Sequence, residues 1–289
     1  MALSPSHKFG QIIGDLLEEI LHRPLSQVAK KHGLYLDVKH PRPARNNRKL
    51  VKWKDHKGND HDLDFVFEQG GSEDEIGVPK AFIESAWRRY TKHSRNKAQE
   101  IQGAITVLAE TYSQHKPFLG AVLAGVYTKG SRRQLESHGF SLLYCPYEVV
   151  LKAFASVGID AAFDEDTPTK VLQDKVNAYD ALTKSQRSVL RRRFHQLTRD
   201  QITLFISELE SSLTRGIDRI RVGTLHGSVC QLQSVDEAVQ FITAYDEEQD
   251  INGFVRYEVD IRYTNGDHVN GEFELKATAI RFLKDLAEG

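Results

Sequence analysis

Cysteine is almost absent from this sequence of 289 residues, which contains two cysteines, one methionine and two tryptophans. Both cysteines, Cys145 and Cys230, lie in apolar stretches, so we expect small core side chains rather than a disulfide or a zinc site. The sequence therefore does not favour a disulfide-stabilised extracellular domain or a small zinc-binding domain.

Long apolar runs and a strong net charge are also missing. No stretch approaches the roughly 20 apolar residues that cross a bilayer, and the N-terminal MALSPSHKFG lacks the pattern of a signal peptide. The formal net charge is −1, so binding to nucleic acid would have to come from local basic patches. We therefore expect a cytoplasmic protein without a membrane partner.

What is present is the composition of an ordinary globular protein, with 40% hydrophobic and 27% charged residues. The length allows one large α/β domain together with a smaller one. The residue patterns predict three parts: a core over residues 1–162, a helical linker or dimerisation region over 163–216, and a C-terminal domain over 217–289.

The first part is predicted to alternate between helices and strands. Apolar residues at helical spacing indicate helices, and alternating or continuous apolar residues indicate strands. Strand–helix–strand segments of these lengths imply a parallel crossover. The expected elements are helices over 8–22 and 25–32, a hairpin of strands 49–53 and 61–68, a strand over 78–86, a helix over 95–113 capped by Ser94, a strand over 118–127, a helix over 131–138, a strand over 140–145 and a helix over 147–155.

The C-terminal part contains a repeated pattern. Residues 219–232 form strand–turn–strand before the helical segment VDEAVQFITAY, and residues 254–275 form the same pattern before KATAIRFLKDL. Two such units predict a ββαββα domain, in which a four-stranded sheet is backed by two helices. Its role is left open between recognition of a target and contact with another protein.

Two acidic residues lie in apolar surroundings on successive predicted strands. Asp64 is embedded in LDFVF and Glu84 in FIESA, where a carboxylate is costly to bury unless it is paired or binds a metal. Mg²⁺ prefers carboxylate oxygens and water, and it can neutralise a phosphodiester and generate hydroxide near neutral pH. The pair predicts a Mg²⁺ site; the alternative is two solvated or salt-bridged charges at strand ends.

With the order of the elements around it, this segment resembles the PD-(D/E)xK nuclease superfamily and, within it, bacterial type II restriction endonucleases. The resemblance covers about residues 8–155 and includes ESAWRRYTKHSRNKAQEIQGAI, which spans Glu84–Ile105. It implies a restriction-endonuclease-like mixed sheet flanked by helices, and a Mg²⁺-dependent endonuclease that cuts double-stranded DNA as a homodimer.

The sequence departs from the superfamily motif at two positions. Leu63 stands where the motif has proline, and Ala86 stands where it has lysine. That lysine positions the attacking water and stabilises the charge that develops. Two residues are candidates to replace it: Lys97, near the start of the following helix and on the same helical face as Glu100, and Lys92, in the segment before that helix.

Two further acids are candidate metal ligands. Asp62 lies two residues before Asp64 and is expected on the same face of the strand. Glu18, on the first helix, is the acid that the resemblance implies for that helix, with Glu19 beside it. An ordinary solvated position remains the alternative for each.

The densest basic cluster, RRYTKHSRNK, follows Glu84 directly. Basic side chains beside a metal site would hold the scissile phosphate, whereas a solvated charged surface is the alternative. The candidate DNA-binding residues are Arg88, Arg89, Lys92, His93 and Arg95 in this cluster, and Lys129, Arg132 and Arg133 after the next core strand.

Three functions are consistent with these patterns. The leading one is a Mg²⁺-dependent endodeoxyribonuclease of the restriction type. The absence of the motif lysine at Ala86 leaves open a non-catalytic DNA-binding protein on a degenerate nuclease fold. The C-terminal repeat leaves open a protein-interaction module.

Overall fold

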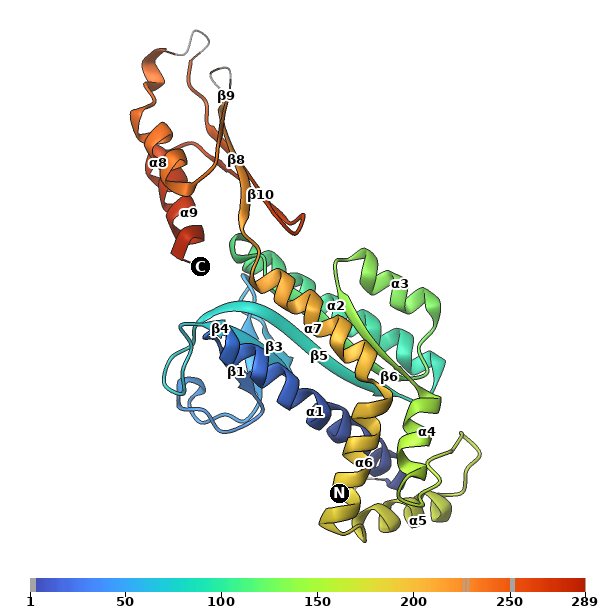
Figure 1. Cartoon of the computed structure of the whole chain (residues 1–289). Helices are drawn as coiled ribbons and strands as arrows, with labels where there is room; N and C mark the ends of the chain where they lie inside the picture. The colour runs from blue at the N-terminus through green and yellow to red at the C-terminus, as the bar shows by residue number, and fades with distance from the viewer. Residues whose placement is uncertain (1–3, 226, 228, 250–252, 289) are drawn as a thin grey trace. The chain divides into compact units, whose positions relative to one another are not determined.

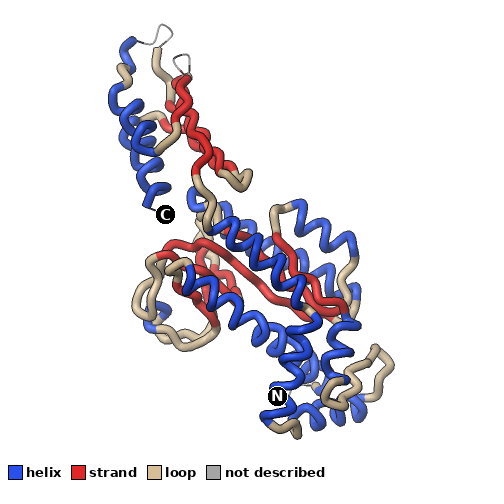
Figure 2. The backbone as a smooth tube through the Cα atoms, in the orientation of Figure 1, coloured by secondary structure: helices blue, strands red, loops and turns tan. Residues whose placement is uncertain are grey.

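The computed structural model describes residues 4–225, 227, 229–249 and 253–288 (Figures 1 and 2). The chain folds into two compact units: the first contains 1–111 and 118–210, and the second contains 112–117 and 211–289. Within the described ranges, no helix has both the length and the apolar character needed to cross a membrane.

The first unit is built on a mixed five-stranded sheet of order β1-β4-β5-β6-β7. β4 pairs antiparallel with β1 and β5, while β6 pairs parallel with β5 and β7. This is the mixed sheet flanked by helices that the sequence predicted. The strands are β1 (Tyr35–Val38), β4 (Phe65–Gln69), β5 (Val78–Arg88), β6 (Phe118–Gly125) and β7 (Ser141–Pro146).

Helices cover both faces of this sheet (Figure 1). α1 and α7 pack on one face, where Trp87 lies against Gly10 and the Phe118 ring is 5.5 Å from that of Phe205. α2 and α3 lie on the other face. The helices are α1 (Pro5–Lys31), α2 (Thr91–Thr111), α3 (Lys129–Ser137), α4 (Tyr147–Ala155), α5 (Thr169–Asp180), α6 (Lys184–Leu197) and α7 (Arg199–Leu213).

α1 is one continuous helix, where the sequence predicted two. Pro24 lies inside it and removes one backbone hydrogen bond. The buried stripe nevertheless continues across the proline, with Leu21 before it and Leu25 and Val28 after it. Burial of this face offsets the lost hydrogen bond, so the helix does not end.

The predicted return strand is interrupted at Asp64, which lies in a bend. β2 (Val51–Lys54) and β3 (Asp60–Leu63) form a separate two-stranded sheet before the bend, and β4 begins after it in the main sheet. The interruption lets the chain pass from one sheet to the other, and it places Asp64 at the junction.

Ser94 is not the cap of the helix after β5. α2 begins at Thr91, and the buried Ser94 hydroxyl donates to the carbonyl of Thr91 at 2.8 Å. The serine is therefore an internal helical residue that bonds back to the preceding turn.

The middle helices do not form a separate linker. α5 and α6 pack against α1, and α6 also packs against α4. Residues up to Glu210 belong to the first compact unit. The apolar residues of these helices, such as Leu190 and Phe194, are buried, which explains why they pack on the core instead of extending away from it.

The second unit has the predicted ββαββα order and a four-stranded antiparallel sheet of order β11-β10-β8-β9. Ala238 and Ile242 of the first helix and Ala279 and Leu283 of the second enter one buried core with the strands. The short segment 112–117 joins this unit, because Arg215 donates to the carbonyls of His115 and Lys116. The elements are β8 (Ile217–Thr224), β9 (Val229–Leu232), α8 (Val235–Ala244), β10 (Tyr257–Tyr263), β11 (His268–Phe273) and α9 (Lys276–Glu288).

A buried ionic network stabilises the loops around β1 and β4. The Arg42 guanidinium is fully buried and lies 2.6 Å from Glu68 and 2.9 Å from Asp37, both of which are also fully buried. Arg42 further donates to the carbonyls of Ser72 and Glu75. This network fixes the loop between β4 and β5, and with it the register of the strand that carries Glu84.

Candidate functional site

Asp64 and Glu84 are neighbours where the main sheet meets the β2–β3 hairpin. The β4–β5 register pairs Phe65 with Ile83, so continuing it by one residue places Asp64 opposite Glu84. Residues directly opposite each other in an antiparallel pair present their side chains on the same face. The sequence expectation that the two carboxylates come together therefore agrees with this geometry.

Ser85 holds the Asp64 carboxylate in place. The backbone amide and the hydroxyl of Ser85 each donate to Oδ2 of Asp64 at 2.7 Å. Two hydrogen bonds to one oxygen fix the orientation of the carboxylate. Ser85 was not a candidate from the sequence, because its alternating position on the strand gave no sign that it would contact Asp64.

Lys97 places a cation beside Glu84, which the methyl side chain of Ala86 cannot do. Its Nζ donates to Oε1 of Glu84 at 3.1 Å and lies 3.8 Å from Glu100. The side chains of Lys97 and Glu84 are 20% and 15% exposed, so the pair is shielded from bulk water. A lysine from α2 thus reaches the carboxylate from outside the strand.

Burial has the largest effect on the pKa of both carboxylates. Burial, followed by the charge of Asp64, raises the pKa of Glu84 to about 8, although Lys97 acts in the opposite direction. Burial also raises the pKa of Asp64, against the hydrogen bonds from Ser85 and the charge of Lys97. Two neighbouring buried acids whose pKa values are both raised are typical of functional sites.

Glu18 and Lys39 contribute to the electrostatic field of the site. Burial and the charge of Asp64 raise the pKa of Glu18 to about 7, while Lys39 lowers it. Lys39 also favours ionised Asp64. Lys39 was missed from the sequence because it follows β1, a four-residue strand that the residue pattern did not predict.

The donor set fits a hard divalent cation. Oε2 of Glu84 is buried and has no hydrogen-bond partner among the residues that the structure describes, and such an atom normally has one. Asp64 and Glu84 would hold Mg²⁺, with Glu18 as a further nearby carboxylate. Across the described ranges, however, no three His, Cys, Asp or Glu side chains are grouped closely enough to hold a metal, so a bound ion would keep several water ligands.

Other candidates lie apart from this cluster. Asp62 does not join Asp64: its carboxylate pairs with Lys52 at 2.7 Å and is 55% exposed, because it lies on β3 before the bend. Lys92 is exposed at the start of α2. Glu19 forms an ion pair with Arg191 on α6.

The basic cluster after Glu84 spans the end of β5 and the first turns of α2. Lys92, His93 and Arg95 are exposed, as DNA-contacting residues would be. Arg89, in contrast, contacts other parts of the protein. Its guanidinium lies 4.1 Å from the ring centroid of Tyr147 and donates to the carbonyl of Phe163 at 2.6 Å. The structure therefore gives Arg89 a packing role.

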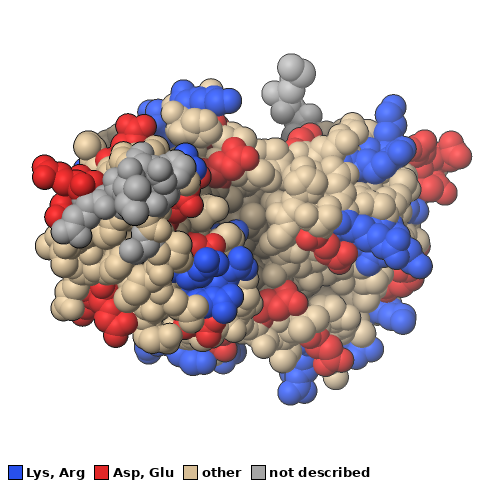
Figure 3. All heavy atoms as spheres, turned by 90° about the horizontal axis from the view of Figure 1, so that it is seen from above, with Lys and Arg blue, Asp and Glu red and all other residues tan. Residues whose placement is uncertain are grey.

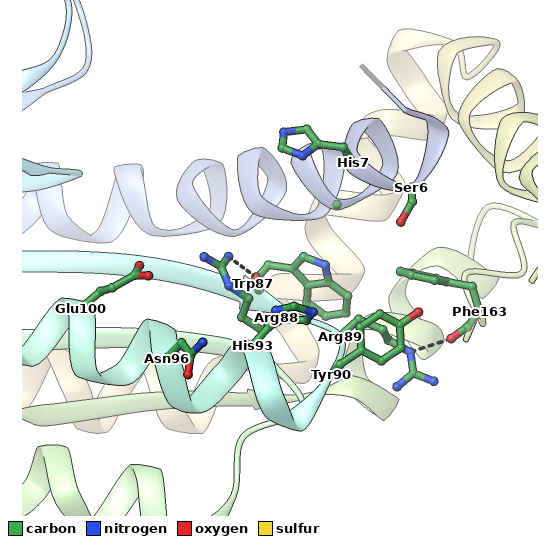
Figure 4. A pocket seen from close by; sticks show the side chains of 11 residues that line it. Ser6, His7, Trp87, Arg88, Arg89, Tyr90, His93, Asn96, Glu100 and Phe163 are labelled. Carbon is green, nitrogen blue, oxygen red and sulfur yellow. Dashed lines mark hydrogen bonds between the residues drawn. The ribbon is translucent and has the colours of Figure 1, made fainter. Parts of the chain in front are cut away.

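A pocket of about 390 Å³ adjoins this cluster. Figure 4 shows side chains from the start of α1 on one side of it, and side chains from the β5–α2 junction and α2 on the other. Glu100, which pairs with Lys97, also lines the pocket. The lining residues are Ser6, His7, Gly10, Trp87, Arg88, Arg89, Tyr90, His93, Asn96, Glu100 and Phe163.

The second group of basic candidates lies on α3. Lys129 and Arg133 are exposed, whereas Arg132 is partly buried with its guanidinium 4.2 Å from the ring centroid of Tyr144. On the face of the molecule in Figure 3, acidic and basic side chains are interspersed. This fits the net charge of −1 and the expectation that any DNA contact depends on local groups.

Comparisons with known proteins supply no family for the chain. No protein-family model matches the sequence, and no curated protein matches it significantly. Among solved structures, it is similar to the crystal structure of a protein of unknown function, AF1548, with 10% identity and a TM-score of 0.27 over 68% of this chain and 98% of that one. A similarity at this level carries no argument about function.

Proposed function

We propose that the first unit is a Mg²⁺-dependent endonuclease that hydrolyses phosphodiester bonds of double-stranded DNA, as restriction endonucleases do. The observation that carries the proposal is the cluster of Asp64, Glu84 and Lys97. It unites two partly buried carboxylates, one of which has an oxygen without a hydrogen-bond partner in the described part of the chain, and a lysine 3.1 Å from Glu84. These are the groups that metal-assisted phosphodiester hydrolysis requires.

Each residue of the cluster has a distinct role in this proposal. A bound Mg²⁺ would neutralise phosphate charge and lower the pKa of a water molecule. Asp64 and Glu84 would hold the cation, with Asp64 oriented by Ser85. Lys97 favours the ionised form of Glu84 against the effect of burial, and it would offer its remaining N–H groups to the attacking water or the scissile phosphate.

The exposed basic residues beside the cluster support DNA as the substrate. Lys92, His93 and Arg95 lie on the first turns of α2, the helix that also carries Lys97. Phosphate contacts from such residues supply affinity without regard to sequence. Cutting both strands of a duplex further calls for two copies of the site, so we propose a homodimer.

Purified protein incubated with plasmid DNA and Mg²⁺, with a parallel reaction in EDTA, tests the proposal. We expect cleavage only with Mg²⁺, and its loss in Asp64→Asn and Glu84→Gln. Asp62→Asn is the matched control, because Asp62 lies two residues away and pairs with Lys52 at the surface. A folded wild-type protein that binds DNA in Ca²⁺ but does not cut it in Mg²⁺ would indicate a non-catalytic DNA-binding protein.

A further inference from the structure

The pocket at the β5–α2 junction has a size suited to a small ligand. Its volume is about 390 Å³, within the range of pockets that bind small molecules. The start of α1 lies opposite Trp87 and Tyr90 (Figure 4), and it lines the pocket with His7 and Gly10. Phe163, from the segment between α4 and α5, lies at one end. Concave walls on opposite sides distinguish it from a flat basic surface.

The lining of the pocket favours an anion. Arg88 faces it from the end of β5, and His7 and His93 line it from α1 and α2. Within the described residues, Arg88 forms no ion pair with a carboxylate; its Nη1 donates to the backbone carbonyl of Trp87. The one acidic lining residue that the structure describes, Glu100, already lies 3.8 Å from Lys97, so the Arg88 guanidinium remains available to a phosphate.

Aromatic rings give the pocket a second kind of recognition. Trp87, Tyr90 and Phe163 line it together, and Arg89 fixes Phe163 through its backbone carbonyl. Gly10 lies next to the edge of the indole, since a Cβ there would be 3.7 Å from Cδ1 and Nε1 of Trp87. Aromatic faces beside cationic groups are the combination that binds single nucleotides, by stacking the base and neutralising the phosphate.

The pocket and the candidate metal cluster lie along the same strand, β5. Arg88 follows Glu84 by four residues on β5, which corresponds to about 13 Å along a strand. The two residues lie on the same face of the strand because side chains alternate. This separation is too large for Arg88 to hold the phosphate at Glu84, and it suits a nucleotide further along the same DNA strand.

We infer that this pocket binds one unpaired nucleotide of the DNA substrate, close to the phosphodiester bond that is cut. A base paired inside a duplex exposes only its edges, so it can reach the aromatic walls only after leaving the stack. The substrate is thus DNA in which a nucleotide is extruded or already unpaired. The inference rests on the proposed function, since it names the DNA form that the same site takes.

The test measures dissociation constants in Ca²⁺ for a fully paired duplex and for the same duplex with one bulged nucleotide. We expect the wild type to bind the bulged duplex about tenfold more tightly, the effect of one stacked base. Gly10→Leu fills the pocket from a helical position and should abolish the preference, as should Arg88→Ala. Gly103→Leu and Arg199→Ala are matched controls on exposed helical positions and should retain it.

Two additional ligands test whether the preference for the bulged duplex comes from stacking of the unpaired base. An abasic bulge should lose the preference, because the base provides the stacking. Free deoxyadenosine monophosphate should bind at least 100-fold more weakly than the bulged duplex, because it lacks the other phosphate contacts. Equal affinity for the free nucleotide would assign the pocket to a small-molecule ligand and overturn the inference.

The outcomes separate the inference from the proposed function. If the wild type cuts DNA in Mg²⁺ but binds both duplexes equally, the inference is wrong and the nuclease proposal stands. If Gly10→Leu retains the tenfold preference, the pocket is not where the nucleotide binds. If the wild type neither cuts nor binds DNA, the nuclease proposal itself fails.

Discussion

Ser85 donates two hydrogen bonds, from its amide and its hydroxyl, to the same oxygen of Asp64 at 2.7 Å each. The hydrogen bond from the backbone amide remains when Ser85 is replaced by alanine, whereas the hydrogen bond from the hydroxyl is lost. Ser85 therefore acts on the candidate metal site through Asp64, as a positioning residue.

Ser85→Ala should weaken the response to Mg²⁺ more than it weakens the maximal rate. Loss of a group that orients a metal ligand typically costs 10- to 100-fold in metal affinity or activity. We expect the Mg²⁺ concentration at half-maximal cleavage to rise about tenfold, with partial recovery in Ser85→Thr. Ser137→Ala is a suitable control, because its exposed hydroxyl bonds to the carbonyl of Gln134. An unchanged Mg²⁺ dependence in Ser85→Ala would contradict this role.

Lys97→Ala should lower the cleavage rate by on the order of 100-fold or more, as for other lost transition-state donors. DNA binding in Ca²⁺ should change little, because one phosphate contact is a small part of the total. Lys92→Ala should lose much less activity, since Lys92 is exposed while Lys97 contacts Glu84. Both variants are compared with the wild type in single-turnover cleavage. Wild-type rates in both would show that neither lysine replaces the one missing at Ala86.

The acidic pair and Lys97 could be found from the sequence because their signals are local. Asp64 and Glu84 are charged residues in apolar strands, where burial without a partner is unfavourable. Lys97 was found from its place on the following helix. The order of the elements in both units followed in the same way from the spacing of apolar residues.

The features that were missed depend on contacts between distant segments. Lys39 reaches the site after β1, whose four residues are too few for a periodic signal. The sequence predicted two helices over 8–22 and 25–32, but burial of Leu25 and Val28 continues α1 through Pro24. The break at Asp64 arises because β3 and β4 pair in different sheets, which alternation along a single strand cannot reveal.

The buried network around Arg42 should be a major source of stability. Arg42→Ala would leave Glu68 buried without its cationic partner and Asp37 with Arg45 alone, and breaking a buried ion pair in this way typically costs about 3–5 kcal/mol. Lys31→Ala removes an ion pair with Glu210 whose lysine is 63% exposed, and it should cost about 0–1 kcal/mol. Chemical denaturation followed by circular dichroism measures both. Similar losses in the two variants would show that the Arg42 network contributes little.

In EDTA, the free energy of unfolding should fall as the pH rises from about 5 to 8. The pKa of Glu84 is raised to about 8 and that of Glu18 to about 7, so in this window the folded chain keeps protons that the unfolded chain releases. Stability therefore decreases with pH, by about 1.4 kcal/mol per pH unit for the proton that Glu84 holds and by less for the partly solvated Glu18. Denaturation curves at several pH values measure this slope.

Glu84→Gln isolates the contribution of the site to that slope. The amide cannot ionise, so the variant should lose less stability than the wild type between pH 5 and pH 8. Mg²⁺ should also reduce the loss of stability of the wild type between pH 5 and pH 8. Cation binding replaces the protons and stabilises the folded state more at high pH. Glu136→Gln, at an exposed position on α3, controls for the loss of one charge. Equal slopes in the wild type and Glu84→Gln would mean that Glu84 is ionised in the folded protein throughout this range, so that the buried carboxylate is already balanced by Lys97 without a cation.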